Sequence, residues 1–288
     1  MKKASFAVAL ICLTALYTAP AAPKKSVTTE TNAADTVDAS VKPGAPARLY
    51  DAAHPAPNAA TVCTIYMIGD STMSNKPLIP AYPERGWGQL FSLYFQSGVR
   101  IENHAMNGRS SKSFIGEGRW KTVRDELKPG DWVIIQFGHN DNKPDTNRFT
   151  EPFGSFKTNL MMYVEESKAR GAHPLLCTSI ARRKFDADGK LVDTHGDYIV
   201  ATRQVATEEK IPLLDLNKRT DELLRQLGDD RSKMLYDWVT TNDIPGMKTN
   251  LVDDTHLNAF GASRVCDMAV AEIRAKVPEL VKFLNTGK

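Results

Sequence analysis

The sequence predicts an α/β protein, a three-layer α/β/α sandwich in which a five-stranded parallel sheet lies between two layers of helices. Short apolar runs rich in Val, Ile and Leu recur from residue 62 onward, as expected of buried strands. Longer amphipathic stretches separate these runs and have the spacing of helices. Strands that alternate with helices form a parallel sheet whose two faces are both covered.

Five runs are expected to be strands because each contains apolar, β-forming residues and ends at small or polar residues. In chain order they are Val62–Ile68, Val99–Asn103, Trp132–Phe137, Pro174–Ser179 and Ile211–Leu216. Four amphipathic stretches are expected to be helices because apolar residues recur at every third or fourth position. They are Trp87–Gln96, Phe153–Arg170, Tyr198–Lys210 and Ala259–Lys276.

Residues 1–22 have the pattern of a secretory signal peptide. Lys2 and Lys3 precede an apolar run, Ala4–Tyr17, and small residues follow it, with cleavage expected near Ala19–Ala22. The run is too short to span a bilayer, which needs roughly 20 apolar residues. We therefore expect a secreted or periplasmic protein, without membrane insertion of the mature chain.

The next segment, residues 23–60, is expected to be a flexible linker. It is rich in Ala, Pro, Thr and Asp and has almost no aromatic residue, so it cannot bury enough apolar surface to order itself. Residues 61–288 then form one folded domain. Cys12 raises the alternative of a surface lipoprotein, but the bulky Ile11 before it disfavours lipoprotein cleavage.

Composition and charge narrow the class of partner. The 288 residues are 42% hydrophobic and 25% charged, as in ordinary globular proteins. Removal of the signal peptide takes away two lysines and lowers the formal net charge from +3 to +1, which gives no electrostatic reason to expect nucleic acid as a partner. The mature chain keeps Cys63, Cys177 and Cys266. An odd number is not a disulfide framework, although one pair involving Cys266 is left open.

Polar segments follow the predicted strands at the edge where ligands bind in such sheets. Gly69–Ser71 comes after the first strand, His104–Ser110 after the second and Gly138–Asp141 after the third. The carboxyl ends of parallel strands meet at one edge, so these three loops are expected to lie together. A fourth polar segment, Asp253–His256, is expected to be a loop just before the last helix.

These segments contain the residue types of nucleophilic catalysis. Ser71 is the candidate nucleophile, and His256 is the candidate base that removes its proton. Asp253, three residues before His256, could orient the imidazole and stabilise the imidazolium. The backbone N–H groups of Ser71 and Gly108 and the side-chain amide of Asn140 are candidate donors to an oxyanion.

Each of these residues also has an ordinary structural interpretation. Ser71 could cap a helix, and His256 could be a packed loop histidine. Asp253 could cap the last helix, Gly108 could mark a turn, and Asn140 could bind its own backbone. Jointly these interpretations must explain four coincidences in chain order, which favours a catalytic site.

Two further carboxylates flank the candidate residues. Asp70 and Asp141 could form the pair of a glycosidase. We expect instead that each accepts hydrogen bonds from the backbone of its own loop and holds that loop in shape.

The four segments in this order resemble the signature blocks of the SGNH (GDSL-like) hydrolases. That resemblance implies a flavodoxin-like fold for a catalytic domain over residues 61–288. It implies Ser71, Gly108, Asn140 and His256 as catalytic residues, with Asp253 as the acid of the triad. It also implies a reaction that needs no metal and no cofactor.

Longer stretches resemble one branch of that family, the rhamnogalacturonan acetylesterases. They are "ERGWGQ" (Glu84–Gln89), "NGRSSKSFIGEGRW" (Asn107–Trp120) and "QFGHNDNK" (Gln136–Lys143). Trp87, Arg109 and Trp120 are candidate substrate-binding residues in these stretches. For the two tryptophans, packing in the core is the competing interpretation.

The expected function is that of a secreted carbohydrate esterase that removes O-acetyl groups from a pectic polysaccharide, with an acetylated poly- or oligosaccharide as its partner. One alternative is an esterase, lipase or thioesterase of the same fold that acts on another acyl substrate, such as acetylxylan. A second alternative is a catalytically silent carbohydrate-binding protein. The oligomeric state is left open.

Overall fold

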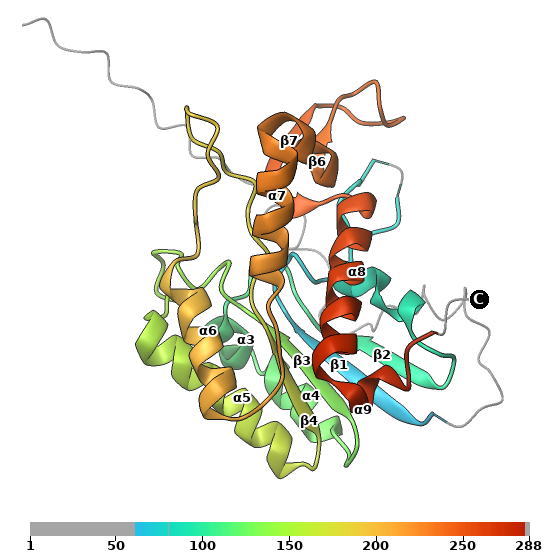
Figure 1. Ribbon diagram of the computed structural model, residues 1–288, viewed down its shortest axis with the longest axis vertical. Coiled ribbons are helices and arrows are strands. Elements are labelled where there is room, and N and C mark those ends of the chain that lie inside the picture. The colour runs from blue at the N-terminus through green and yellow to red at the C-terminus, as the bar shows by residue number, and fades with distance from the viewer. Residues whose placement is uncertain (1–60, 80, 286–288) are drawn as a thin grey trace, which may run out of the picture.

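The computed structural model describes residues 61–79 and 81–285 and is built around one central sheet. The strands are β1 (Cys63–Gly69), β2 (Val99–Asn103), β3 (Trp132–Gln136), β4 (His173–Cys177) and β5 (Leu213–Leu214). Their order is β2-β1-β3-β4-β5, with every neighbouring pair parallel (Figure 1). The predicted five-stranded parallel sheet is confirmed. The predicted signal peptide and linker lie outside the described residues.

Both faces of the sheet are covered by helices. One face carries α3 (Ser111–Gly116), α4 (Arg119–Glu126), α5 (Lys157–Ala169) and α6 (Asp197–Glu208), preceded by the π-helical turn η3 (Pro152–Phe156). The other carries α2 (Trp87–Leu90), the 3₁₀ turn η2 (Phe91–Tyr94), α7 (Leu216–Ser232), α8 (Ala259–Lys276) and α9 (Pro278–Val281). The three-layer sandwich predicted by the alternation of strands and helices is therefore confirmed (Figure 1).

The side chains of the central strands explain why these strands are apolar throughout. Ile65 and Met67 of β1 pack on the face that carries α8, whereas Tyr66 and Ile68 pack on the face that carries α5. Successive residues of a strand point to opposite faces, so in a strand covered on both sides every position favours an apolar side chain.

Four helices, α3, α4, α7 and the short α9, are not among those expected from the sequence. Most side chains of α4 are polar, and only Trp120 and Val123 are buried, so no broad apolar stripe marks this helix. In α3 the start is set by Ser110, whose hydroxyl accepts the N–H of Ser113 while the Ser113 hydroxyl accepts the N–H of Ser110. This reciprocal cap stabilises a helix too short to show apolar periodicity.

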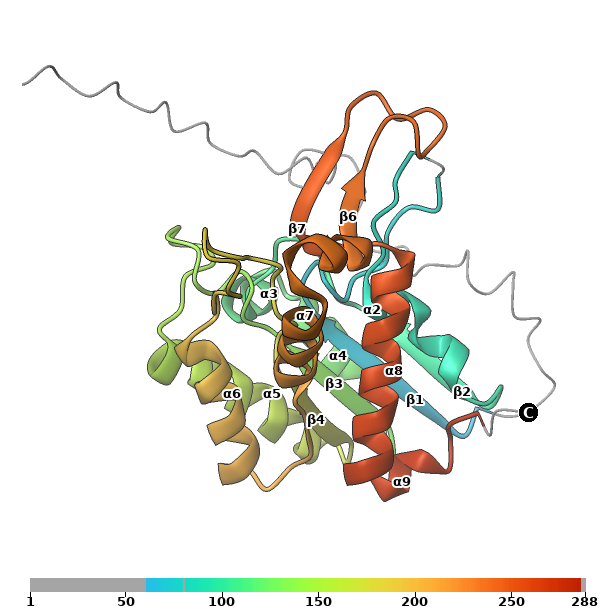
Figure 2. The same cartoon turned by 45° about the horizontal axis from the view of Figure 1, so that its top comes forward.

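The prediction of a loop at Asp253–His256 is wrong, because these residues lie in a strand. β7 (Leu251–Leu257) pairs antiparallel with β6 (Tyr236–Val239), which follows the 3₁₀ turn η4 (Lys233–Leu235). The hairpin stands above the central sheet at the edge that carries the candidate site (Figure 2). The polar residues Asp253–His256 lie where the register of this pairing shifts, between Val252 and Leu257, so no alternating pattern indicates the strand.

All three described cysteines are buried and unpaired. Cys63 and Cys177 lie in the core, as expected. Cys266 lies on α8 with its Sγ 3.0 Å from the carbonyl oxygen of Trp87. The disulfide that the sequence left open for Cys266 is therefore absent from the described residues.

Candidate active site

The turn after β1 is fixed by its own residues. A Cβ on Gly69 would lie 2.7 Å from the carbonyl oxygen of Gln136, so only glycine fits there. Asp70 accepts the backbone N–H of Thr72 at 2.9 Å and its hydroxyl at 2.8 Å. Asp70 is fully buried, and burial raises the pKa of its carboxyl. It holds the turn, as expected, and the turn presents Ser71.

Ser71 is joined to His256 and Asp253 by short hydrogen bonds. Ser71 Oγ lies 2.8 Å from His256 Nε2, and His256 Nδ1 lies 2.7 Å from Asp253 Oδ2. The other carboxylate oxygen, Asp253 Oδ1, accepts the backbone N–H groups of Thr255 at 2.7 Å and His256 at 2.9 Å. The three side chains predicted as a triad are thus brought together from β7 and from the end of β1.

The charges around the Ser71–His256–Asp253 relay favour an ionised Asp253 carboxylate beside a basic His256 imidazole. Burial acts to raise the pKa of Asp253, but the hydrogen bonds from His256 and from the backbone outweigh it and lower the pKa. Burial acts to lower the pKa of His256, but the hydrogen bond to Asp253 and the charge of Glu84 raise it above its ordinary value. The ring is therefore held by an ionised carboxylate.

The predicted oxyanion donors border the same pocket as Ser71. Gly108, from the loop after β2, has a φ of 73°, which favours glycine. Asn140, from the loop after β3, donates one amide hydrogen of Nδ2 to the carbonyl oxygen of Arg109 at 3.1 Å. Ser71, Gly108, Asn140 and His256 all line this one pocket, which is small and open to solvent. The loops after β1, β2 and β3 converge as expected.

Asp141 also behaves as the sequence analysis expects. Its Oδ1 accepts the backbone N–H of Ser111 at 3.0 Å, the Ser111 hydroxyl at 2.6 Å and the Thr150 hydroxyl at 3.0 Å. Burial raises its pKa to about 7. These bonds tie the loop that carries Asn140 to the start of α3. The Asp141 carboxylate is not among the groups that line the pocket.

The prediction that Trp87 and Trp120 bind substrate is wrong, because both side chains are buried. Trp87 is completely buried, and its Nε1 donates to Gln136 Oε1 at 2.9 Å. Gln136 in turn donates to the hydroxyl of Thr72 at 2.7 Å, so this tryptophan supports the turn that holds Ser71. Trp120 is 3% exposed and packs edge-on against Tyr163, with ring centroids 5.0 Å apart. Neither indole presents a face to a sugar.

The third predicted substrate-binding residue, Arg109, lies beside the site. Its guanidinium bonds Glu117 at 3.1 Å and the carbonyl oxygen of Asn107 at 2.7 Å. Its backbone carbonyl accepts the Asn140 amide, and its guanidinium contacts the loop after β2 at Asn107, next to Gly108. A role of the Arg109 side chain in substrate binding stays a prediction.

The sequence analysis missed a buried charged cluster behind His256. Lys76 bonds both Glu84 and the side chain of Asn107, and a Glu84 oxygen lies 3.9 Å from His256 Nε2. Asp237 of β6 is 2% exposed, and burial raises its pKa to about 8. Lys76 and Glu84 lie in irregular segments, where nothing in their spacing separates a buried ion pair from two solvated charges.

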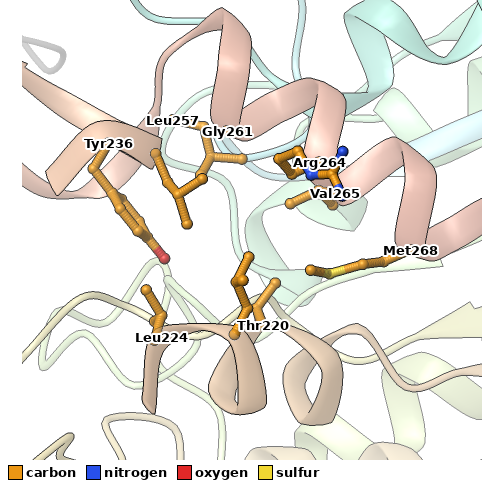
Figure 3. Close-up of a pocket in the computed structure, with 10 residues that line it drawn as sticks. Thr220, Leu224, Tyr236, Leu257, Gly261, Arg264, Val265 and Met268 are labelled. Atoms are coloured by element: carbon orange, nitrogen blue, oxygen red, sulfur yellow. The ribbon is translucent and has the colours of Figure 1, made fainter. Parts of the chain in front are cut away.

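A second hollow lies away from this chemistry. It is lined mainly by apolar side chains of α7 and α8 and by residues of the hairpin (Figure 3). Tyr236 and Leu257 border it, and the Tyr236 hydroxyl donates to the carbonyl oxygen of Ala181 at 2.7 Å. No side chain of the Ser71 relay borders this hollow, so it reflects packing between α7 and α8.

Within residues 61–79 and 81–285, no His, Cys, Asp and Glu side chains group as a metal site would require. No helix in that part of the chain is long and apolar enough to cross a membrane.

Comparison with known proteins gives consistent matches. The sequence model of the GDSL-like Lipase/Acylhydrolase family matches residues 67–264. The chain is 38% identical, over 208 residues, to the rhamnogalacturonan acetylesterase RhgT of Bacillus subtilis (strain 168), which covers 72% of this chain and 88% of that protein. It is 32% identical, over 213 residues, to the probable rhamnogalacturonan acetylesterase YesY of the same strain, covering 73% of this chain and 92% of that protein.

A solved structure has the same fold. The crystal structure of the YxiM protein of Bacillus subtilis aligns with a TM-score of 0.64 and 28% sequence identity. The alignment covers 75% of this chain and 57% of YxiM.

Proposed function

The chain belongs to the GDSL-like lipase/acylhydrolase family and is a carboxylic-ester hydrolase, and from that premise we propose that it is a secreted rhamnogalacturonan acetylesterase. In this proposal Ser71, His256 and Asp253 carry out acyl transfer. Ser71, Gly108 and Asn140 stabilise the oxyanion.

The observation that carries the proposed mechanism is the continuous relay from serine to carboxylate. The Ser71 Oγ–His256 Nε2 distance of 2.8 Å lets the imidazole take the hydroxyl proton without any rearrangement. The His256 Nδ1–Asp253 Oδ2 distance of 2.7 Å keeps the proton on Nδ1, so that Nε2 is the basic nitrogen.

In the first step, Ser71 Oγ attacks the acetyl carbonyl carbon while His256 Nε2 accepts the serine proton. The negative charge that develops on the carbonyl oxygen is stabilised by the N–H groups of Ser71 and Gly108 and by the amide of Asn140. The imidazolium then gives its proton to the sugar oxygen, which leaves as a hydroxyl group. Acetyl-Ser71 remains.

In the second step, His256 takes a proton from water, and the resulting hydroxide attacks the acetyl-serine carbonyl in the same pocket. Collapse of this second intermediate releases acetate, and the proton returns to Ser71 Oγ. Asp253 stays ionised throughout, in keeping with the lowered pKa of its carboxyl.

The choice of substrate rests on the relatives and on the character of the pocket. The names of RhgT and YesY specify rhamnogalacturonan acetylesterases. The mouth of the pocket is polar and includes the cations Lys143 and Arg182, which favours a hydrophilic, anionic substrate over a long acyl chain. A lipase or thioesterase needs a slot lined by aliphatic side chains, and the residues that line this pocket do not form one.

Export of the protein is proposed from residues 1–22, with their two lysines, apolar run and small residues. Mass spectrometry of the protein from the medium and the periplasm of an expressing bacterium tests it. A protein found only inside the cell with residues 1–22 intact would contradict export.

Acetate release tests the substrate assignment. Rates on acetylated rhamnogalacturonan, acetylxylan and a long-chain fatty ester are to be compared at equal ester concentration. We expect the highest kcat/KM on acetylated rhamnogalacturonan, because the pocket is polar and cationic. Equal values on all three, or a preference for the fatty ester, would contradict the assignment.

The pH profile tests the role of His256. Below its pKa the imidazole is protonated and cannot accept the Ser71 proton, so kcat/KM falls as the pH falls. Since the pKa of His256 is raised, the midpoint of this acid limb is expected above the ordinary histidine value of about 6.5. Glu84→Gln removes a negative charge 3.9 Å from His256 Nε2 and should move the midpoint to lower pH.

The matched control for this profile is Glu102→Gln, which removes an equal charge on β2, where Glu102 pairs with Arg100. Its acid limb should coincide with that of the wild type. A midpoint that does not move in Glu84→Gln, or that moves to higher pH, would refute the proposed electrostatic effect of Glu84 on His256.

A further inference from the structure

Arg182 is a half-buried cation at the catalytic pocket without an acidic partner. It borders the pocket together with Ser71 and His256. Its Nη2 donates to the carbonyl oxygen of His139 at 2.8 Å and its Nη1 to the hydroxyl of Thr194 at 3.3 Å. Among the described residues it forms no ion pair with a carboxylate, and three of its five N–H donors have no partner.

Neighbouring cations differ from Arg182 in this respect. Arg183, the next residue, pairs with both Asp229 and Asp254 and stacks on Trp238. Arg148, which also borders the pocket, pairs with Asp145 at 2.8 Å. Removing a guanidinium from water costs free energy that an opposite charge normally offsets. For Arg182 the nearest negative charges, those of Asp70 and Asp253, act without a direct ion pair, so its guanidinium N–H groups stay available to a ligand.

A second polar group beside Arg182 also lacks a partner. His139 is 2% exposed and borders the pocket, and its Nε2 has no hydrogen-bond partner among the described residues. Its Nδ1 lies 3.1 Å from Nε2 of His195. Burial and the positive charge of Arg182 hold the pKa of both rings below the ordinary value, to about 3 for His195, so both are neutral at neutral pH.

We infer that Arg182, with His139 beside it, forms a subsite for the carboxylate of a uronate residue in the substrate. A planar guanidinium with free N–H groups matches a carboxylate in geometry and charge, and the neutral imidazole offers a hydrogen bond to a sugar hydroxyl. The inference rests on the proposed function, because it requires that the acetyl group bound at Ser71 belongs to a polysaccharide that contains uronate.

The subsite would distinguish substrates of the same ester chemistry. A uronate next to the acetyl ester places its carboxylate at Arg182 when the carbonyl carbon is at Ser71. A neutral chain such as acetylxylan leaves Arg182 without a carboxylate in direct contact. Selectivity then comes from the unpaired cation in the free enzyme and not from the catalytic relay.

The test compares acetylated rhamnogalacturonan oligosaccharides with the same oligosaccharides after methyl esterification of their carboxyl groups. Wild-type kcat/KM should be about tenfold to a hundredfold higher on the acid form, the range of one charge-assisted hydrogen bond, and mostly through a lower KM. In Arg182→Gln the ratio of acid to ester should fall to about one. Arg182→Lys keeps the charge without the planar fork and should give an intermediate ratio.

The matched control is Arg148→Gln, which removes a cation of the same pocket that already has a carboxylate partner. It should keep most of the acid preference. Equal wild-type rates on the acid and the ester, an unchanged ratio in Arg182→Gln, or an equal loss in Arg148→Gln would each overturn the assignment. The wild-type comparison needs no variant, so it decides the matter even if Arg182→Gln does not fold.

A second measurement separates this inference from the proposed function. Deacetylated oligosaccharides, as acid and as methyl ester, are tested as inhibitors of 4-nitrophenyl acetate hydrolysis by the wild type and by Arg182→Gln. Stronger inhibition by the acid, lost in Arg182→Gln, supports the subsite even if no acetate is released from rhamnogalacturonan. Equal or absent inhibition by both forms overturns the subsite, even if acetate release confirms the proposed function.

Discussion

Replacing Ser71 by alanine is expected to lower kcat for acetate release by about 10⁶-fold, the loss seen when a serine nucleophile is removed from such a triad. Without Oγ there is no atom to form the acetyl intermediate, and His256 Nε2 loses the partner that lies 2.8 Å away. The rate is measured on 4-nitrophenyl acetate and on acetylated oligosaccharide. Labelling by a fluorophosphonate, which traps activated serines, is measured in parallel.

The control for this variant is Ser74→Ala, three residues later in the same turn. The Ser74 hydroxyl donates to Asn107 Oδ1 at 2.6 Å and does not contact His256. Wild type and Ser74→Ala should both be labelled, whereas folded Ser71→Ala should not. A folded wild-type protein that resists labelling would refute the mechanism and favour a protein that binds carbohydrate without chemistry.

Replacing Asp253 by asparagine is expected to lower kcat by about 10⁴-fold while the protein stays folded. Asp253 accepts hydrogen bonds from Nδ1 of His256 and from two backbone N–H groups, so its carboxylate fixes the tautomer in which Nε2 is basic. An asparagine amide can donate to Nδ1, which leaves the proton on Nε2, the wrong nitrogen for accepting the Ser71 proton. Steady-state kinetics give the loss, and circular dichroism checks the fold.

The adjacent carboxylate provides the control. Asp254 lies on the same strand but bonds Arg183 and the indole of Trp238, not His256. Asp254→Asn should therefore change stability more than kcat. An equal loss of kcat in Asp253→Asn and Asp254→Asn would show that general disruption of β7, not the loss of the triad acid, accounts for the effect.

The central sheet could be predicted because each of its strands has a local signal. β1 and β3 are covered on both faces, so their apolar residues run without interruption. The hairpin could not be predicted. Asp253 and Asp254 give β7 the composition of a loop. The strand forms because the preceding strand, β6, supplies hydrogen bonds and the indole of Trp238 donates to Asp254.

The sequence indicated which residues belong to the site better than it indicated whether each side chain is buried, paired or exposed. Trp87 and Trp120 lie within stretches that resemble the family, yet whether an indole faces a pocket or the core depends on the helices packed around it. Lys76 and Arg182 are two of 37 lysines and arginines. No spacing rule separates the buried member of an ion pair or the unpartnered cation from those that solvent surrounds.

The sequence by itself determined the alternation of buried strands and helices and the chain order of Ser71, Gly108, Asn140 and His256, because apolar runs and short motifs are local properties. Tertiary structure decided which side chains meet. Asp253 reaches His256 only in the hairpin, and Glu84 approaches it only through a loop that returns to the site. Arg182 lacks a direct ion pair only because of what packs around it. Contacts between residues distant along the chain depend on the whole fold. The distances between the site residues, their burial and the charges around them are therefore properties of the folded structure and not of any local stretch of sequence.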